Sequence, residues 1–98
     1  MSTFQTFYDT HLTAEIKKYT PDFTAFIPTG GSVSSASTAY TQTYNGSASG
    51  SCATTVTASA ATFTTPALSA TGLYQFVVSA TLSDSQVRKA VYVVRVDA

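Results

Sequence analysis

The chain has 98 residues, no formal net charge and only 10% charged residues. A chain of this length forms one domain with a thin hydrophobic core. The sparse charge excludes a basic surface for nucleic acid and for anionic membranes, because both partners need clustered Lys and Arg. We therefore expect no nucleic acid and no membrane among its partners.

Residues 1–21 hold the only His and two of the three Lys. Their larger apolar residues fall close to helical spacing, although Leu12, Ala14 and Ile16 also alternate as in a strand. We predict an N-terminal anchoring arm, partly helical or extended, that ends at Pro21. Such an aromatic arm has too little protein of its own to bury it, so we expect it to bind a partner subunit. The predicted partner-binding residues are Phe4, Phe7, Tyr8, Leu12, Ile16 and Tyr19.

Turn signals divide the middle of the chain into short strands. Pro28-Thr29-Gly30-Gly31 predicts a turn, and Asn45-Gly46 is a dipeptide typical of hairpin turns. The small, polar tract 45–51 is expected to be an exposed loop. The strands predicted around these signals are 22–27, 32–44, 52–58 and 60–65, with Phe63 buried in the last.

The clearest pattern is at the C-terminal end. Residues 73–82 and 87–96 both alternate with period two, and a four-residue polar loop separates them, which predicts a hairpin. Tyr74 and Tyr92 fall on the face assigned to the core. Several short strands with turns between them predict an all-β fold, a single immunoglobulin-like antiparallel β-sandwich over residues 22–98.

No cluster of residues predicts chemistry. His11 has no second His or Cys nearby, and metal sites need several convergent ligands. Cys52 has no His in the sandwich to activate it, so a structural thiol is the simpler interpretation. Asp22 and Asp84 are explained as turn and capping residues. We expect no catalytic residue, no metal site, no cofactor and no enzymatic activity.

The N-terminal residues show no basic region followed by an apolar stretch, so we expect synthesis in the host cytoplasm without a signal peptide. Small Ser- and Thr-rich β-domains are nevertheless typical of exposed surfaces. Virion proteins, which are made in the cytoplasm and released by lysis, satisfy both conditions. The expected location is therefore the virion.

Three stretches carry a resemblance over about three-quarters of the chain. They are Tyr19-Thr-Pro-Asp-Phe-Thr-Ala-Phe-Ile, Gly31-Ser-Val-Ser-Ser-Ala, and Tyr74-Gln-Phe-Val-Val-Ser-Ala-Thr-Leu-Ser-Asp-Ser-Gln-Val-Arg. In this order they resemble the immunoglobulin-like accessory proteins of tailed-phage virions, of the fibre–tail adaptor and capsid decoration type. The chain departs from the pattern by having no Trp after the aspartate and an unusual loop at 45–51. The resemblance implies no catalytic residues.

The expected function is that of a non-enzymatic virion subunit, first of all a capsid cement (decoration) protein that binds the major capsid protein lattice. A neck or fibre–tail adaptor protein is the alternative within this class. The expected partners are phage structural proteins, either the major capsid protein or neck and tail proteins, and copies of the chain itself. A carbohydrate-binding or adhesin module is the alternative from another class, although such sites often use Trp, which this chain lacks.

Overall fold

The computed structural model describes residues 2–68 and 70–98, with side chains described from residue 6 onward. Strands dominate the described chain, and its one helical element is a short 3-10 turn, η1. The elements are β1 (Ser2–Leu12), β2 (Lys18–Tyr19), η1 (Thr24–Phe26), β3 (Val33–Tyr44), β4 (Ser49–Cys52), β5 (Thr54–Val56), β6 (Ala61–Thr64), β7 (Gly72–Leu82) and β8 (Val87–Asp97).

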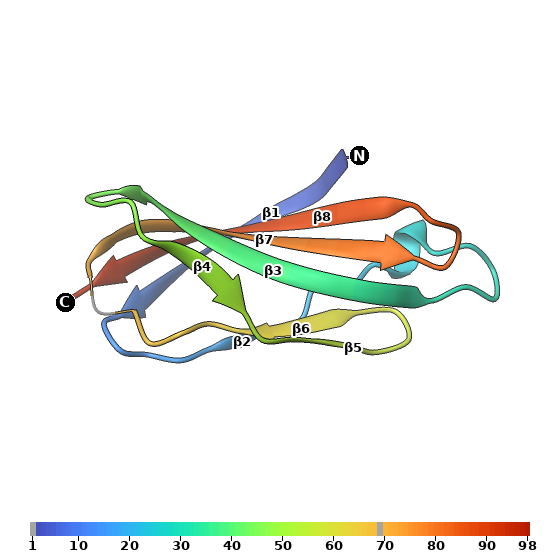
Figure 1. The fold of residues 1–98 in the computed structure, drawn as a ribbon, viewed down its shortest axis with the longest axis horizontal. Coiled ribbons are helices and arrows are strands. Elements are labelled where there is room, and N and C mark those ends of the chain that lie inside the picture. The colour runs from blue at the N-terminus through green and yellow to red at the C-terminus, as the bar shows by residue number, and fades with distance from the viewer. Residues whose placement is uncertain (1, 69) are drawn as a thin grey trace.

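The strands form two sheets that face each other in an elongated molecule of 45 × 21 × 19 Å (Figure 1). The larger sheet has the order β1-β8-β7-β3-β4, and the smaller has the order β2-β6-β5. The predicted all-β, immunoglobulin-like sandwich is confirmed. One pairing departs from a purely antiparallel arrangement, because β1 runs parallel to β8.

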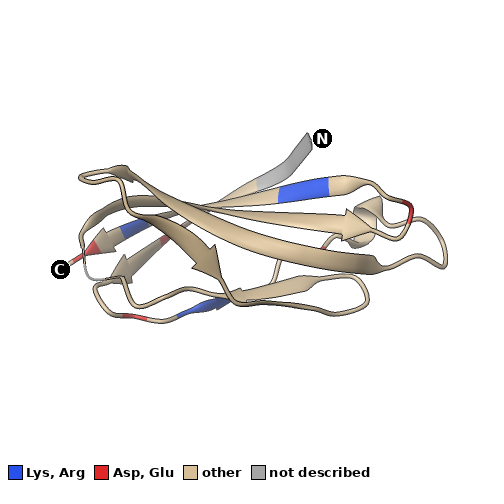
Figure 2. Ribbon diagram, viewed as in Figure 1, with Lys and Arg blue, Asp and Glu red and all other residues tan. Residues whose placement is uncertain are grey.

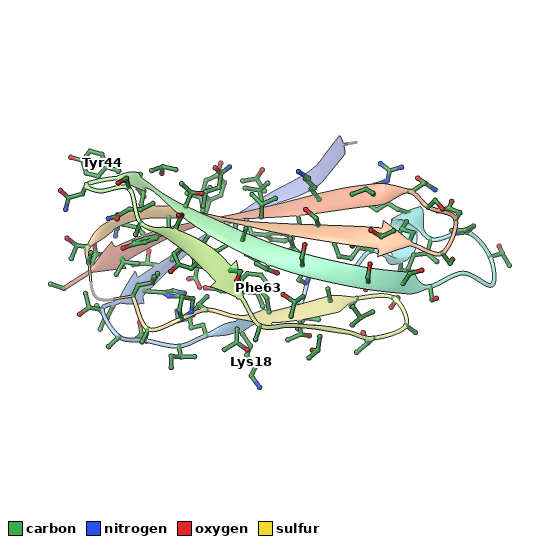
Figure 3. The ribbon with its side chains drawn as sticks, viewed as in Figure 1. Lys18, Tyr44 and Phe63 are labelled. Carbon is green, nitrogen blue, oxygen red and sulfur yellow. The ribbon has the colours of Figure 1, made fainter. Side chains whose placement is uncertain are left out.

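The core lies between the sheets and is built mainly by the C-terminal hairpin. Every second residue is buried from Tyr74 to Leu82 and from Ala90 to Val96, as the alternation predicts, and both Tyr74 and Tyr92 are among them. Val91, on the other face of β8, is buried as well. Phe63 of the smaller sheet points into the space between the sheets (Figure 3) and stacks on Phe76 with ring centroids 5.7 Å apart. Each such large side chain contributes about 1.5–3 kcal/mol by leaving water.

The predicted strand at 22–27 is wrong. Asp22 makes only an isolated bridge to Ala60, and the chain then turns through η1. The Asp22 carboxylate accepts hydrogen bonds from the backbone N–H and the hydroxyl of Thr24, at 2.8 and 2.5 Å. This local cap confirms the prediction of Asp22 as a turn and capping residue, and it closes a turn where a strand was predicted.

The tract 45–51 is only partly the loop that its composition predicts. Its last residues form β4, which pairs antiparallel with β3 from Thr38 opposite Cys52 to Thr41 opposite Ser49. The turn predicted at Pro28-Thr29-Gly30-Gly31 is confirmed by a 2.8 Å hydrogen bond from the Gly31 N–H to the Pro28 carbonyl.

The segment 1–21 contributes a strand to each sheet. Of the two patterns in its sequence, the structure adopts the alternation of a strand: β1 pairs with β8 along its length, with a bulge between Thr3 and Gln5. β2 pairs with β6 in the smaller sheet. The segment is extended, and it crosses from one sheet to the other through the corner at residues 13–17 (Figure 1).

Candidate functional site

The predicted partner-binding residues divide into two groups. Phe7 and Tyr19 point inward: Phe7 stacks on Tyr92 at 4.5 Å between centroids, and Tyr19 packs on both Tyr92, at 4.9 Å, and Phe63, at 5.4 Å. Both residues pack against the core and are only partly buried. The side chain of Phe4 lies outside the described residues.

Tyr8, Leu12 and Ile16 point outward. Their exposed fractions are 78%, 56% and 63%, which are high for large apolar side chains. Within β1 the alternation explains why Phe7 faces inward and Tyr8 and Leu12 face outward, because successive side chains of a strand face opposite sides of a sheet. Ile16 lies in the corner that follows β1. The structure therefore leaves three of the six predicted residues on the surface.

A polar cluster around the buried His11, which the sequence did not predict, ties the two sheets together at the corner. His11 of β1 is 1% exposed, and its Nε2 lies 2.6 Å from the hydroxyl of Tyr19 on β2. The Tyr19 hydroxyl donates a short hydrogen bond to Asp9 Oδ2. The single hydroxyl proton of Tyr19 is used in that hydrogen bond. His11 Nε2 therefore carries the proton of the hydrogen bond to the Tyr19 oxygen.

Lys17 completes this cluster from the corner. Its Nζ lies 3.5 Å from Asp9 Oδ2 and donates to the Thr10 carbonyl at 3.1 Å. The cluster of Asp9, His11, Lys17 and Tyr19 thus joins one cation, one carboxylate and two rings from β1, β2 and the corner between them.

The protonation states of the cluster follow from this geometry. The hydrogen bond from Tyr19 is the largest cause that lowers the pKa of Asp9 below its usual value. Burial raises the pKa of Tyr19 above its ordinary value, and burial is also the main cause that lowers the pKa of His11. At neutral pH the cluster is therefore an ionised Asp9, a neutral His11 and a protonated Tyr19.

The cluster joins the two sheets, because its members come from β1, β2 and the corner between them. His11 is almost fully enclosed, so solutes have no path to its imidazole. What the cluster does is hold β2 of the smaller sheet against β1 of the larger one. Across residues 2–68 and 70–98, no group of three or more His, Cys, Asp or Glu side chains is placed to hold a metal ion.

Cys52 is half-buried at the end of β4, and burial raises its pKa to about 11. Its thiol therefore stays protonated at neutral pH and is a weak nucleophile. This agrees with its interpretation as a structural residue. No helix in the described part of the chain has the length and apolar character to cross a membrane.

The outer face of the larger sheet carries the other notable surface. We define it by three cross-strand rows that run from β1 through β8 and β7 to β3. They are Thr6-Val91-Val77-Ala39, Tyr8-Val93-Gln75-Thr41 and Thr10-Arg95-Leu73-Tyr44. Figure 2 shows how few charged residues the strands of this sheet carry.

Two shallow grooves lie at one end of this face. One, of about 450 Å³, is lined by Tyr8 and Val93, and the other, of about 360 Å³, by Tyr44 and Gly72; Arg95 borders both. Tyr44 is 67% exposed and projects from the end of β3 (Figure 3). Arg95 is held by Asp97, with 3.2 Å between Nε and Oδ2.

Comparison with known proteins shows the fold and no family. No protein-family model and no curated protein matches the chain. InlP of Listeria monocytogenes is similar in structure, with a TM-score of 0.59 and 18% identity, over 97% of this chain and 27% of that one. A 2,6-sialyltransferase of Photobacterium sp. JT-ISH-224 has a TM-score of 0.54 and 15% identity, over 99% of this chain and 18% of that one.

A superoxide reductase (neelaredoxin) of Ignicoccus hospitalis is similar over 90% of this chain and 74% of that one, with a TM-score of 0.57 and 9% identity. The chain thus spans only about a quarter or less of the first two proteins. At these identities the likeness concerns the fold alone, because one β-sandwich carries many functions. None of the three is described as a phage protein, so the resemblance to phage accessory proteins stays a prediction.

Proposed function

We propose that the protein is a non-enzymatic structural subunit of a tailed-phage virion that docks through its N-terminal segment. The observation that carries the proposal is the exposure of Tyr8, Leu12 and Ile16 on one short segment of a protein with few charges. Exposed large apolar side chains on a neutral surface favour association with another protein. The resemblance of the sequence to phage accessory proteins supports the virion as the setting.

Leu12 and Ile16 are the side chains best suited to a contact with a larger assembly. Leu12 ends β1 and Ile16 lies in the corner between β1 and β2, where contacts among Asp9, His11, Lys17 and Tyr19 tie the two strands together. A contact site that its own protein already holds in place loses little conformational entropy on binding. A capsid cement protein suits a small module of this kind, because weak contacts are multiplied on a lattice.

The test is incorporation into particles. Virions from cells that express the tagged protein with its phage are purified on a density gradient, and copies per particle are counted by quantitative immunoblotting. We expect hundreds of copies on the shell and their loss in the double variant Leu12→Glu/Ile16→Glu. Val56→Glu is the matched control, because Val56 is a 38% exposed apolar residue on β5 of the other sheet.

Each outcome has a clear meaning. A handful of copies at the neck rejects the cement protein and favours the adaptor. Absence of the wild-type protein from particles, or equal loss in Val56→Glu and in the double variant, rejects docking through the N-terminal segment.

A carbohydrate-binding module is the second candidate, and the two grooves favour it. Tyr8 and Tyr44 rim them with aromatic rings, and Arg95 lies between as a hydrogen-bond donor. Such a combination suits the apolar faces and hydroxyl groups of a sugar. Glycan-array binding that is lost in Tyr44→Ala but kept in Leu12→Glu/Ile16→Glu would support this candidate over the first.

A further inference from the structure

β1 is an edge strand, and its backbone shows which groups face away from the sheet. In a parallel pair, alternate residues direct both N–H and C=O to the neighbouring strand, and the residues between direct theirs outward. The Thr13 N–H bonds to the Asp97 carbonyl at 2.9 Å, just beyond the end of β8 pairing. Since the register is continuous from Gln5 to Leu12, odd residues face β8 and even residues face the open edge.

The contacts of Thr10 and Leu12 agree with this alternation. The Thr10 N–H donates to Asp9 Oδ1 at 2.8 Å, and its carbonyl accepts from Lys17. The Leu12 N–H donates to Glu15 Oε1 at 2.5 Å, and its carbonyl accepts from the Glu15 N–H at 3.2 Å. Charged side chains and the corner therefore block the open edge from residue 10 onward.

The open edge is different at Thr6 and Tyr8. By the same alternation, their N–H and C=O groups point away from β8, and both side chains are exposed. Residues 2–8 carry no charge and no Pro. Charge, Pro and covering segments are the usual means by which proteins stop an edge from pairing. β1 uses such protection at one end and has none at Thr6 and Tyr8.

We propose that this open edge pairs with the same edge of a second copy, in antiparallel orientation about a two-fold axis at Phe7. Thr6 then lies opposite Tyr8 of the second copy, and Tyr8 opposite its Thr6. Each of these two pairs exchanges both backbone hydrogen bonds, about four in all. The two larger sheets become one continuous sheet across the dimer.

The side chains of β1 suit this register. The two copies of Phe7 face each other as a close cross-strand pair on the inner side, where aromatic pairs stabilise a sheet. Phe7 is only half-buried in one copy, on its stack with Tyr92, so the second copy covers the remainder. No like charges meet, since the nearest charged residue of β1, Asp9, is engaged by Tyr19 and Lys17.

A second copy is the occupant best supported, because the same short, uncharged edge is present on both molecules and is self-complementary. The blocked groups at Thr10 and Leu12 limit the overlap to a few residues, so the dimer is weak. This inference deepens the proposed function by placing the contact between copies, and it takes only its setting from that function. Leu12 and Ile16 remain outside the paired residues and free for another protein.

The test uses the purified full chain in sedimentation velocity, up to about 1 mM, which detects even weak dimers. We expect a reversible monomer–dimer equilibrium that weakens at least about tenfold in Tyr8→Lys, since a lysine on an edge opposes pairing. Tyr44→Lys is the matched control: Tyr44 is similarly exposed but lies on β3, away from this edge. Thr6→Pro is a second variant, because it removes an N–H that β8 does not use.

Hydrogen exchange gives a readout at single residues. The Phe7 amide is protected at every concentration because it pairs with β8, whereas the Thr6 and Tyr8 amides become protected only as dimers form. A monomer at the highest concentration, equal weakening in Tyr8→Lys and Tyr44→Lys, or unchanged exchange of the Thr6 and Tyr8 amides would overturn the proposal. If Thr6→Pro fails to fold, the two lysine variants and the exchange data decide.

The two proposals fail separately. A chain that stays monomeric but still joins particles rejects only the pairing. A chain that dimerises through β1 but never joins particles rejects only the virion role.

Discussion

His11 and Tyr19 are joined across the two sheets, with 2.6 Å between the imidazole Nε2 and the phenol oxygen. The residues belong to β1 and β2, so this contact fixes where the chain leaves the larger sheet and enters the smaller one. Asp9 accepts a hydrogen bond from the phenol hydroxyl, and the His11 N–H donates one to the phenol oxygen. The three groups satisfy one another, with His11 enclosed and the Asp9 side chain 38% exposed.

Replacing Tyr19 by Phe tests how much this contact contributes to the free energy of unfolding. The change keeps the ring against Phe63 and Tyr92 but removes the hydroxyl, which leaves the buried His11 N–H without its partner. An unsatisfied buried group costs about 1–3 kcal/mol, so we expect a fall of that size in the free energy of unfolding. Urea unfolding followed by circular dichroism measures it.

Tyr44→Phe is the matched control, because that hydroxyl is on an exposed residue at the end of β3. We expect a change within about 0.5 kcal/mol there, as for most surface substitutions. Equal effects of the two substitutions would mean that the cluster adds nothing to stability.

The cluster also predicts how stability depends on pH. Burial lowers the pKa of His11 below its ordinary 6.5, so below pH 6.5 the unfolded chain binds a proton that the folded chain does not. Stability from this group is complete above pH 6.5 and is lost as the pH falls through the folded pKa. Asp9, whose pKa is lowered from 3.8, adds a second loss at more acid pH.

Urea unfolding at a series of pH values from about 8 to about 5 isolates the His11 contribution, because model carboxylates stay ionised over most of this range. We expect wild-type stability to fall toward the acid end and His11→Gln to show a flatter curve. The amide of Gln donates a hydrogen bond as His11 does but does not titrate. Parallel curves for the two proteins would exclude His11 as the source.

The C-terminal hairpin shows what a sequence alone predicts well. The core-facing residues of β7 and β8 recur with a period of two, which assigns each side chain to a face without knowledge of the rest of the fold. Tyr74 and Tyr92 are buried as that pattern predicts. The pattern depends only on residues that are close in sequence, so it can be recognised without knowledge of the tertiary contacts.

The contacts of the N-terminal segment could not be predicted in this way. Asp9 and His11 lie on the inner face of β1, where polar residues obscure the strand pattern, and their partner Tyr19 lies beyond a corner. Only the crossing from one sheet to the other brings the three together. At Asp22 the predicted turn and capping role is confirmed, but the predicted strand over 22–27 is wrong, since the carboxylate that caps Thr24 leads the chain into η1.

Gly72, at the start of β7, has a backbone conformation and surroundings that a residue with a Cβ does not fit. Its φ is +141°, and a Cβ there would lie 2.2 Å from the Tyr44 carbonyl oxygen. Gly72→Ala should therefore cost about 3 kcal/mol or more, through backbone strain and displacement of β3. Thermal unfolding measures the loss.

Gly30→Ala is the control for conformational strain alone. Gly30 also has a positive φ, +78°, but a Cβ added there meets nothing within 4 Å. We expect a cost of about 1 kcal/mol from the left-handed backbone. A Gly72→Ala variant as stable as Gly30→Ala would show that the contact with Tyr44 yields easily.

Removal of residues 2–19 tests whether the sandwich can exist without the segment first predicted to be an anchoring arm. The deletion takes β1 and β2 from the two sheets, and with them Phe7 and Tyr19, which pack on the buried Tyr92. Loss of aromatic core residues costs about 3–5 kcal/mol each, which approaches the whole stability of a small domain. We expect the truncated chain to lack a cooperative unfolding transition.

The double variant Leu12→Ser/Ile16→Ser separates this effect from loss of surface contacts. Both side chains are exposed, so we expect its unfolding midpoint to stay close to that of the wild type. Circular dichroism and urea unfolding of both proteins make the comparison. A truncated chain that unfolds cooperatively would show that residues 22–98 fold alone, and the N-terminal segment would then be an appended arm whose inward contacts are dispensable.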